Sequence, residues 1–387
     1  MGPSLSFGYA SFAGLFFVGT LARAMLISVL PLQALALLGD AQKVSVLYFS
    51  VSVGGILASL LVPAIVRAIG CYQAFLLSMM VMALSALLLW AGNNVWLFII
   101  GMFCHVFAIA SMEISLSLYI MRQIARGNLT RFEPLRIMFT VLALAIGPWL
   151  GVYLESRVAH WIPYAITVVS TVATVIYFRL LGLHKIAIGT SLAKTVNPLR
   201  YMGRYFRQPR LRLAWGLILG RAAWWTMFVI YTPIYAQRAG LGELVGAAVV
   251  SIGTAWTLTV PFWGWVGRQI SLRRLLMIGF FITGVMSLFV FAFASNPWAA
   301  STLLIFAALG ATILDGGGNV LFFRAVRPLD RSEMTGVFLT YRDSAQLAAP
   351  GLFAILLKFF ALPIVFASSA AGMFVCAYYS RYVPRRM

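Results

Sequence analysis

Long apolar stretches recur along this chain, separated by short polar pieces that carry Arg, Asn, Gly or Pro. Each stretch approaches the roughly 20 residues that a helix needs to cross the hydrocarbon core of a bilayer. Lipid offers no partner for exposed backbone groups, and the stretches do not alternate as barrel strands do, so we predict helices. The fold class is therefore all-α integral membrane, with twelve transmembrane helices. The predicted spans lie near residues 9–38, 44–66, 74–92, 95–121, 136–154, 159–181, 213–238, 244–267, 275–294, 298–323, 337–358 and 360–380.

The second half of the chain repeats the first at an offset of about 202 residues. At this offset Pro148 aligns with Pro350 and Glu113 aligns with Asp315. Because each half holds an even number of spans, the two halves enter the membrane in the same direction and form a parallel repeat. We predict an N-terminal six-helix bundle, a basic cytoplasmic linker and a C-terminal six-helix bundle, at residues 1–181, 182–212 and 213–387.

Composition supports a place in lipid. The chain is 62% hydrophobic and 10% charged, whereas a soluble chain is about one-quarter charged. The net charge of +20 does not indicate a nucleic-acid partner, because the basic residues concentrate in alternate loops, as the positive-inside rule describes. The predicted outer loops hold only Lys43, Arg157, Arg238 and Lys358. We expect a multi-pass protein of a bacterial-type inner (plasma) membrane with both termini cytoplasmic, and a linker that is either a short amphipathic helix on the inner leaflet or a tether.

The residues that catalysis or metal binding would need are scattered. The three cysteines, Cys71, Cys104 and Cys376, and the three histidines form no cluster, and no phosphate-binding loop of the Gly-x-x-x-x-Gly-Lys-Ser/Thr type occurs. We therefore predict that the chain is no enzyme, holds no metal and uses no cofactor. An ion gradient would then supply the driving force.

Two six-helix halves joined by a basic linker resemble the major facilitator superfamily over nearly the whole chain. The family's loop signature after the second span survives in part, as Arg67 and Gly70, and Gly147-Pro148-x-x-Gly151 is similar to the core of its antiporter motif. That motif is associated with exporters, although a proline at the matching place in the second half is typical of a purely structural bend. The resemblance implies that spans one, four, seven and ten line a central cavity.

Ionisable residues at bilayer depth cost several kcal/mol and usually mark a solute or proton path. Arginine binds carboxylate or phosphate in a bidentate manner, so we predict that Arg23 and Arg221 bind an anionic group of the solute. The predicted substrate-binding set is Arg23, Arg221, Trp225, Asn319 and Trp256. The predicted proton-coupling set is Glu113, Asp315, His105, Asp343 and Arg342. The predicted hinge and gating set is Gly147, Pro148, Gly151, Gly316, Gly317 and Gly318.

Each of these roles has a structural alternative. The carboxylates could simply pair with arginines to hold helices together, and His105 could be a hydrogen-bonded packing residue. Three glycines from Gly316 could allow a close helix crossing, and Trp225 and Trp256 could belong to a membrane-interface belt.

The function predicted from these residues is secondary active transport. We predict proton-coupled export of a small amphipathic or anionic molecule by alternating access. The alternative is an uptake carrier or exchanger for organic anions or phosphate esters. The expected partners are a small-molecule substrate, protons as the coupling ion and the lipid bilayer, with the protein acting as a monomer.

Overall fold

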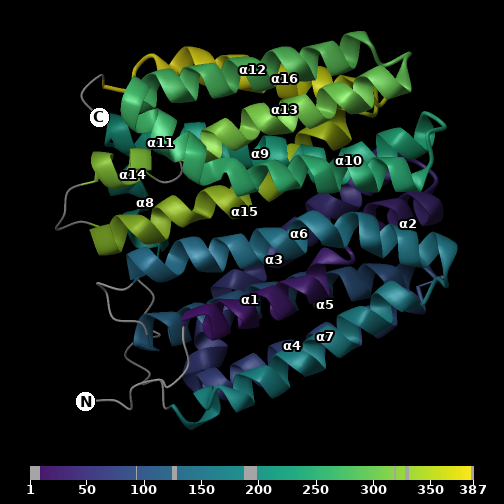
Figure 1. The fold of residues 1–387 in the computed structure, drawn as a ribbon, viewed down its shortest axis with the longest axis vertical. Helices are drawn as coiled ribbons and strands as arrows, with labels where there is room; N and C mark the ends of the chain where they lie inside the picture. The colour runs from purple at the N-terminus through teal and green to yellow at the C-terminus, as the bar shows by residue number, and fades with distance from the viewer. Residues whose placement is uncertain are drawn as a thin grey trace. The chain divides into compact units, whose positions relative to one another are not determined.

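The computed structural model describes residues 9–92, 94–123, 129–186, 198–317, 320–326 and 331–384. Over these residues every regular element is a helix, either α or 3₁₀ (Figure 1). The prediction of an all-helical fold is confirmed. Apolar side chains such as Leu180 (69% exposed) and Val169 (66% exposed) face outward, which suits a chain whose surroundings are lipid rather than water.

Within the described residues one helix, or a set of successive helical segments, occupies each place where a span was predicted. In chain order these are α1 (Tyr9–Ala24) with α2 (Val29–Leu38), α3 (Ala41–Ile69), α4 (Cys71–Trp90), α5 (Val95–Gln123), α6 (Leu129–Arg157), α7 (Ile162–Leu180), α9 (Pro209–Arg238), α10 (Glu243–Ala255) with η4 (Trp256–Thr259) and α11 (Val260–Ile270), α12 (Leu272–Ala292), α13 (Pro297–Gly317) with α14 (Val320–Ala325), α15 (Arg331–Leu356) and α16 (Ile364–Ser380).

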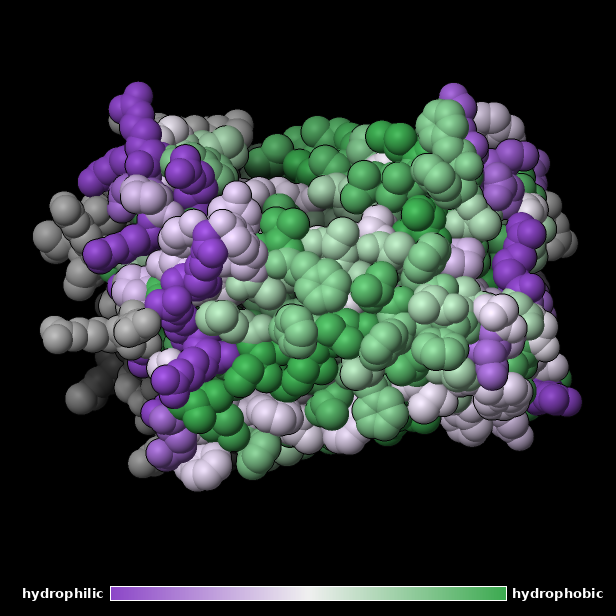
Figure 2. Space-filling model, turned by 90° about the horizontal axis from the view of Figure 1, so that it is seen from above, coloured by the Kyte–Doolittle hydropathy of each residue, from purple (hydrophilic) through white to green (hydrophobic). Residues whose placement is uncertain are grey.

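Ten of these spans are long and apolar enough to cross a membrane by length and composition, counted over the described residues. The other two are α15, which carries Arg342 and Asp343 near its middle, and α16, which has 17 residues. Figure 2 looks from above, the side on which Figure 1 draws α12 and α16, and shows an apolar band between two polar ends. A helical membrane fold of twelve spans accounts for this pattern.

The first of two compact units comprises residues 1–33 and 50–195. In it α1 packs against α6 and α7, and α4 packs against α5 and α7. Aromatic rings close one core of the unit: Phe75 stacks on Phe178 with 4.4 Å between ring centroids, and Tyr119 meets Phe178 edge-on at 4.9 Å. These three side chains are fully buried.

The second unit comprises residues 34–49 and 196–387. Here α12 packs against α13 and α16, and α9 packs against α10, α15 and α16. Although the repeat assigns residues 34–49 to the first half, they pack in this unit, where the Ser45 hydroxyl lies 2.6 Å from the Tyr231 hydroxyl. The predicted domain boundaries at 181 and 212 stay a prediction.

The predicted linker contains a helix that packs against helices of the second unit. α8 (Pro198–Phe206) lies against α15 and α9, and Tyr205 is fully buried with its hydroxyl donating to the Leu211 carbonyl at 3.1 Å. This burial raises the pKa of Tyr205 above its ordinary value. The aromatic face of α8 packs on the second unit, because that face completes a core around Phe322 and Phe338, and a place for this helix on the inner leaflet stays a prediction.

Candidate functional site

In the first unit an ion pair joins the first and fourth spans. Arg23, in the last turn of α1, donates from Nη1 to Glu113 Oε1 on α5 at 2.5 Å. The two side chains are 19% and 33% exposed. The Nε atom of Arg23 is buried and has no hydrogen-bond partner among the described residues. Two predicted site residues are thus in contact, and the arginine keeps a donor that a further acceptor could use.

The first span is broken immediately after Arg23. Residues 25–28 form a turn between α1 and α2, where the Leu26 N–H donates to the Arg23 carbonyl at 3.2 Å instead of reaching one residue further back. The Ala22 carbonyl thereby loses its helical donor and accepts instead from the Thr167 hydroxyl of α7 at 2.9 Å. A side chain from a neighbouring span therefore satisfies the backbone at the break, as a low-dielectric environment requires.

The antiporter-like motif of α6 lies against this break. A Cβ added at Gly147 would lie 2.6 Å from the carbonyl carbon of Ala24, and one at Gly151 would lie 3.2 Å from the Cα of Met25 and closer still to its carbonyl oxygen. No side chain fits at either glycine, so α6 approaches the backbone of the first span as closely as two helices can. The structure thus gives these glycines a packing role beside Arg23, while a hinge role for them and for Pro148 stays a prediction.

His105 occupies a buried position on α5. It is 5% exposed, and its Nδ1 lies 3.4 Å from the Ser85 hydroxyl on α4. Ser85 also donates to the Met82 carbonyl of its own helix at 2.7 Å. This arrangement fits the packing interpretation of His105, and a part in proton movement remains a prediction.

A second ion pair lies in the second unit, between the seventh and tenth spans. Arg221 Nη1 on α9 lies 3.2 Å from Asp315 Oδ1 on α13, and the side chains are 12% and 22% exposed. Trp225, one turn further along α9, donates from Nε1 to the other carboxylate oxygen at 3.1 Å. Trp224 beside it is fully buried and donates to Ser287 at 2.9 Å. Asp315 is therefore held by an arginine and a tryptophan from the same helix.

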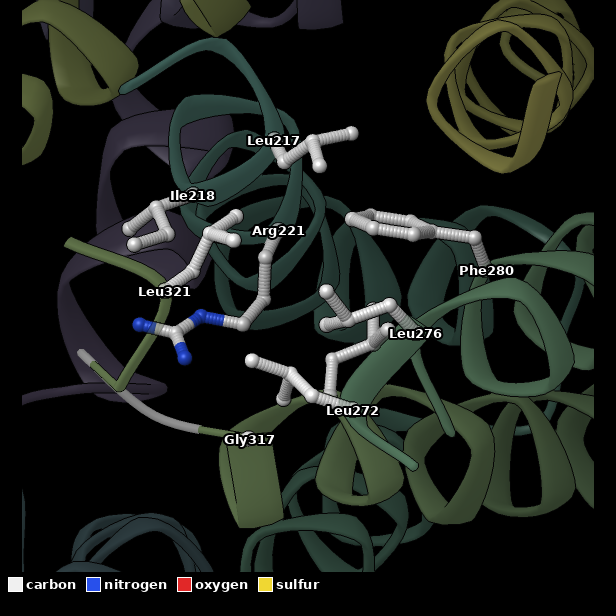
Figure 3. Close-up of a pocket in the computed structure, with 9 residues that line it drawn as sticks. Leu217, Ile218, Arg221, Leu272, Leu276, Phe280, Gly317 and Leu321 are labelled. Atoms are coloured by element: carbon white, nitrogen blue, oxygen red, sulfur yellow. The ribbon is translucent and has the colours of Figure 1, made fainter. Parts of the chain in front are cut away.

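The aliphatic part of Arg221 lies in apolar surroundings (Figure 3). It lines a cavity of about 10 Å³ together with Leu272, Leu276 and Phe280, and in the close-up its guanidinium extends away from Phe280. Such a volume holds about one water molecule. This cavity is too small for an organic solute.

The two ion pairs correspond through the repeat. Glu113 and Asp315 are equivalent at the 202-residue offset, and so are Arg23 and Trp225. Both residues at the second equivalent position donate to the carboxylate of their own half. The second half therefore keeps the carboxylate and the donor position but supplies its positive charge one turn earlier, from Arg221.

The amino-acid sequence of this chain matches a known protein family. The sequence profile described as Major Facilitator Superfamily matches residues 12–350. This chain belongs to the major facilitator superfamily. No curated protein sequence matches it.

Solved structures resemble the superfamily fold of this chain along its length. A crystal structure of the nucleoside transporter NupG has a TM-score of 0.74 at 12% identity, covering 97% of this chain and 99% of that one. A peptide transporter POT in complex with sulfate has a TM-score of 0.77 at 12% identity, with 98% and 94% covered. A POT family transporter in complex with 5-aminolevulinic acid has a TM-score of 0.76 at 14% identity, with 97% and 96% covered. At these identities the likeness shows the fold alone.

The other predicted residues do not join the ion pairs. Trp256 begins the 3₁₀ segment η4, with its Nε1 buried and unpartnered among the described residues, and no described ring contact or hydrogen bond links it to Trp225. A Cβ at Gly316 would lie 2.8 Å from the carbonyl carbon of Trp263 on α11, and one at Gly317 would lie 3.0 Å from Leu272 Cδ1. These two glycines thus allow a close helix crossing, as the structural alternative expects.

The structure does not test the predicted roles of four further residues. Asn319 and Gly318 lie outside the described residues. Arg342 and Asp343 lie in α15, which begins at Arg331 rather than near residue 337. At 1.5 Å per residue, Arg342 lies about 16 Å from the start of its helix, deeper than a residue one turn inside the predicted span. Their coupling role stays a prediction.

Sequence reasoning missed the residues that support the broken first span. Thr167 gives no signal in the sequence, because it is one of several Ser and Thr residues on α7 and its neighbours Thr171 and Thr174 bond only to carbonyls of their own helix. Gln33 was also missed: it donates to the Leu89 carbonyl at 2.8 Å and accepts from the Tyr164 hydroxyl at 2.7 Å. The sign available in the sequence was that Gln33 is a single polar residue in an apolar stretch, two residues after Pro31.

Proposed function

We propose that this superfamily member is a secondary active transporter that couples the movement of a small solute to protons, with Glu113 and Asp315 as the proton-binding groups. The observation that carries the proposal is the recurrence of an arginine–carboxylate ion pair in each half. Both pairs lie within spans, where ionisable groups are costly unless they serve a function or have a partner. Mere stapling of helices would not require the same acid position in both repeats.

Protonation of a carboxylate removes the charge that neutralises its arginine. A guanidinium left without an anion in a low-dielectric environment is strongly unfavourable. The arginine must then bind another anion, or the helices that carry it must rearrange. Proton occupancy is thus linked to solute occupancy or to conformation, which is the requirement for coupled alternating access.

We propose export as the direction, with a small amphipathic solute that competes with the proton for the carboxylates. When solute and proton exclude each other, an inward proton gradient drives the solute outward. The close packing of Gly147 and Gly151 on the break beside Arg23 supports this direction, because it connects an exporter-associated motif with the ion pair.

An uptake carrier for organic anions or phosphate esters is the second candidate, and one observation favours it. The buried Nε of Arg23 has no partner in the described structure, so an anion could use it. An anion that displaces Glu113 from Arg23 leaves a carboxylate that takes up a proton more readily. Anion and proton would then move in the same direction. The similar structures include a nucleoside transporter and a peptide transporter in complex with sulfate, and we propose that this chain likewise takes a polar organic solute.

We further propose a bacterial-type inner membrane with both termini on the cytoplasmic side, and a monomer as the working unit. The distribution of Lys and Arg between alternate loops supports this orientation. Glycosylation or cysteine-labelling reporters fused to the C-terminus would test it.

Thermal stabilisation of the purified protein tests the chemical class of the solute. The probes are sulfate, uridine, dialanine and tetraphenylphosphonium, added to wild type, Arg23→Ala, Arg221→Ala and the exposed control Arg324→Ala. A ligand at 100 times its Kd adds about 2.7 kcal/mol. If sulfate stabilises wild type and Arg324→Ala but neither site variant, the anion carrier is correct. If tetraphenylphosphonium or uridine stabilises all four proteins, the arginines are partners of the carboxylates and the export proposal stands.

A further inference from the structure

A groove lies between α12 and α16 of the second unit. It has a volume of about 500 Å³, and its walls are Met277, Ile278, Phe281, Phe374, Ala377 and Tyr378, with Arg381 at one end. Phe281 is 57% exposed and Ile278 is 44% exposed. In a membrane these side chains meet lipid, so the groove is open to acyl chains.

Arg381 is held in place at the end of the groove. It follows the last residue of α16, and its guanidinium lies 3.4 Å from the ring centroid of Tyr378 and 4.9 Å from that of Tyr382. It also donates to the hydroxyls of both tyrosines. Within the described part of the chain no carboxylate forms an ion pair with Arg381. A fixed positive charge therefore stands beside an apolar groove, and no carboxylate of the described residues neutralises it.

Two more arginines lie at the same end. Arg273 and Arg274 are in the first turn of α12, one turn before Met277, and the start of α12 lies near the end of α16 because the two helices run antiparallel (Figure 1). The first turn is the unfavourable end of a helix for a cation. Helix stability does not account for these arginines; the positive-inside rule places them at this end, where they also attract an anionic headgroup.

We propose that this groove binds one anionic phospholipid of the cytoplasmic leaflet, with its phosphate on Arg381 and one acyl chain along Phe281 and Phe374. From Arg381 to Phe374 the helix rises about 10 Å, so the groove leads from headgroup level into the hydrocarbon region. Basic pockets between spans on the cytoplasmic side suit such headgroups. The choice of leaflet rests on the proposed orientation of the termini, but the site itself does not depend on the transport proposal.

Photo-crosslinking to lipids tests this site. The full chain is reconstituted in nanodiscs of phosphatidylcholine mixed with phosphatidylglycerol in known proportion, with the photoreactive benzoylphenylalanine replacing Phe281. The matched control replaces Phe289, which is on the same helix and 43% exposed but does not line the groove. Mass spectrometry then gives the ratio of the two lipids in the crosslinked product.

We expect phosphatidylglycerol to be enriched about fivefold over its bulk proportion at position 281, the equivalent of ~1 kcal/mol for one arginine near an anionic headgroup. At position 289 the bulk proportion is expected. Arg381→Gln should remove the enrichment, whereas Arg324→Gln, with the same net charge, should keep it. The proposal is overturned if position 281 gives the bulk proportion, or if Arg381→Gln keeps the enrichment while circular dichroism shows that it is folded.

Discussion

The two ion pairs differ in what surrounds them, although the repeat gives them equivalent carboxylates. In the first unit Arg23 stands at the end of α1, next to a broken helix, and the Glu113 side chain is 33% exposed. In the second unit Arg221 lies inside the continuous helix α9, and Asp315 is 22% exposed and also accepts from Trp225. The first pair is the more exposed, and in the second a tryptophan adds a hydrogen bond to the carboxylate.

From this difference we expect the two carboxylates to have different roles. Both halves have a carboxylate at the same position of their fourth span, and both have a hydrogen-bond donor at the same position of their first span. The arginine is at that donor position in the first half and one turn before it in the second half. A pair beside a helix break can open with little loss of backbone hydrogen bonding, because Thr167 already satisfies the Ala22 carbonyl. We therefore expect Glu113 to exchange protons first and Asp315 to respond to the conformation of its half.

The largest effect is expected from filling the contact between α6 and the break. Gly151→Val would place side-chain atoms within the backbone of Met25. Core overpacking typically costs about 1–3 kcal/mol, and a clash with backbone should cost more, so folded yield should collapse. Size-exclusion chromatography and thermal denaturation in detergent measure this.

The control for this substitution is Gly372→Val on α16, where no atom lies within 4 Å of an added Cβ. It should fold as wild type does. Normal yield and normal melting of Gly151→Val would show that the break beside Arg23 does not need the close approach of α6. The proposed difference between the surroundings of Arg23 and those of Arg221 would then be contradicted.

The next effect tests the relation between the halves. Arg221→Ala leaves Asp315 without its cation, and loss of one partner of a buried pair costs about 3–5 kcal/mol. Adding Trp225→Arg to this variant places an arginine at the position equivalent to Arg23. We expect the double variant to recover most of the lost thermal stability in detergent.

Failure of the double variant to recover stability would contradict this prediction. If the double variant melts at or below the temperature of Arg221→Ala alone, the donor positions in the two halves are not interchangeable. The exposed control Arg324→Ala should change the melting temperature little, since surface charges contribute little to stability.

A smaller effect is expected at the break itself. Thr167→Val removes the donor to the Ala22 carbonyl, and an unsatisfied buried acceptor costs about 1–3 kcal/mol. Thr171→Val is the matched control, because the Thr171 hydroxyl bonds to the Thr167 carbonyl of its own helix. Thermal denaturation should rank Thr167→Val below Thr171→Val, and equal melting would mean that the break does not depend on α7.

Much of the fold follows from the sequence for a physical reason. The length of each apolar stretch fixes the spans, and the 202-residue repeat fixes which acids are equivalent, because lipid leaves helices as the available structure. The same reasoning placed Arg23, Glu113, Arg221 and Asp315 on the spans that carry the ion pairs.

The remainder could not be predicted because it depends on contacts between side chains of different helices. Pro31 has no N–H to bond to the Ile27 carbonyl and was the available sign of a break at residues 25–28, whereas Thr167 resembles the other hydroxyl residues of α7. Amphipathicity shows that one face of α8 is apolar but not what covers it, and in the structure its aromatic face packs on the second unit. The hydrogen bond from Trp225 to Asp315 could not be predicted either, and the solute-binding role of Trp225 stays a prediction.

Proton movement in proteoliposomes tests the central claim most directly. A pH-sensitive dye inside the vesicles follows proton flux when the stabilising solute is added, for wild type, Glu113→Gln, Asp315→Asn and the control Glu243→Gln, whose residue lies in the first turn of α10. The account predicts solute-dependent proton flux in wild type and Glu243→Gln and none in the other two variants, all of which fold. Undiminished flux in both Glu113→Gln and Asp315→Asn would contradict it.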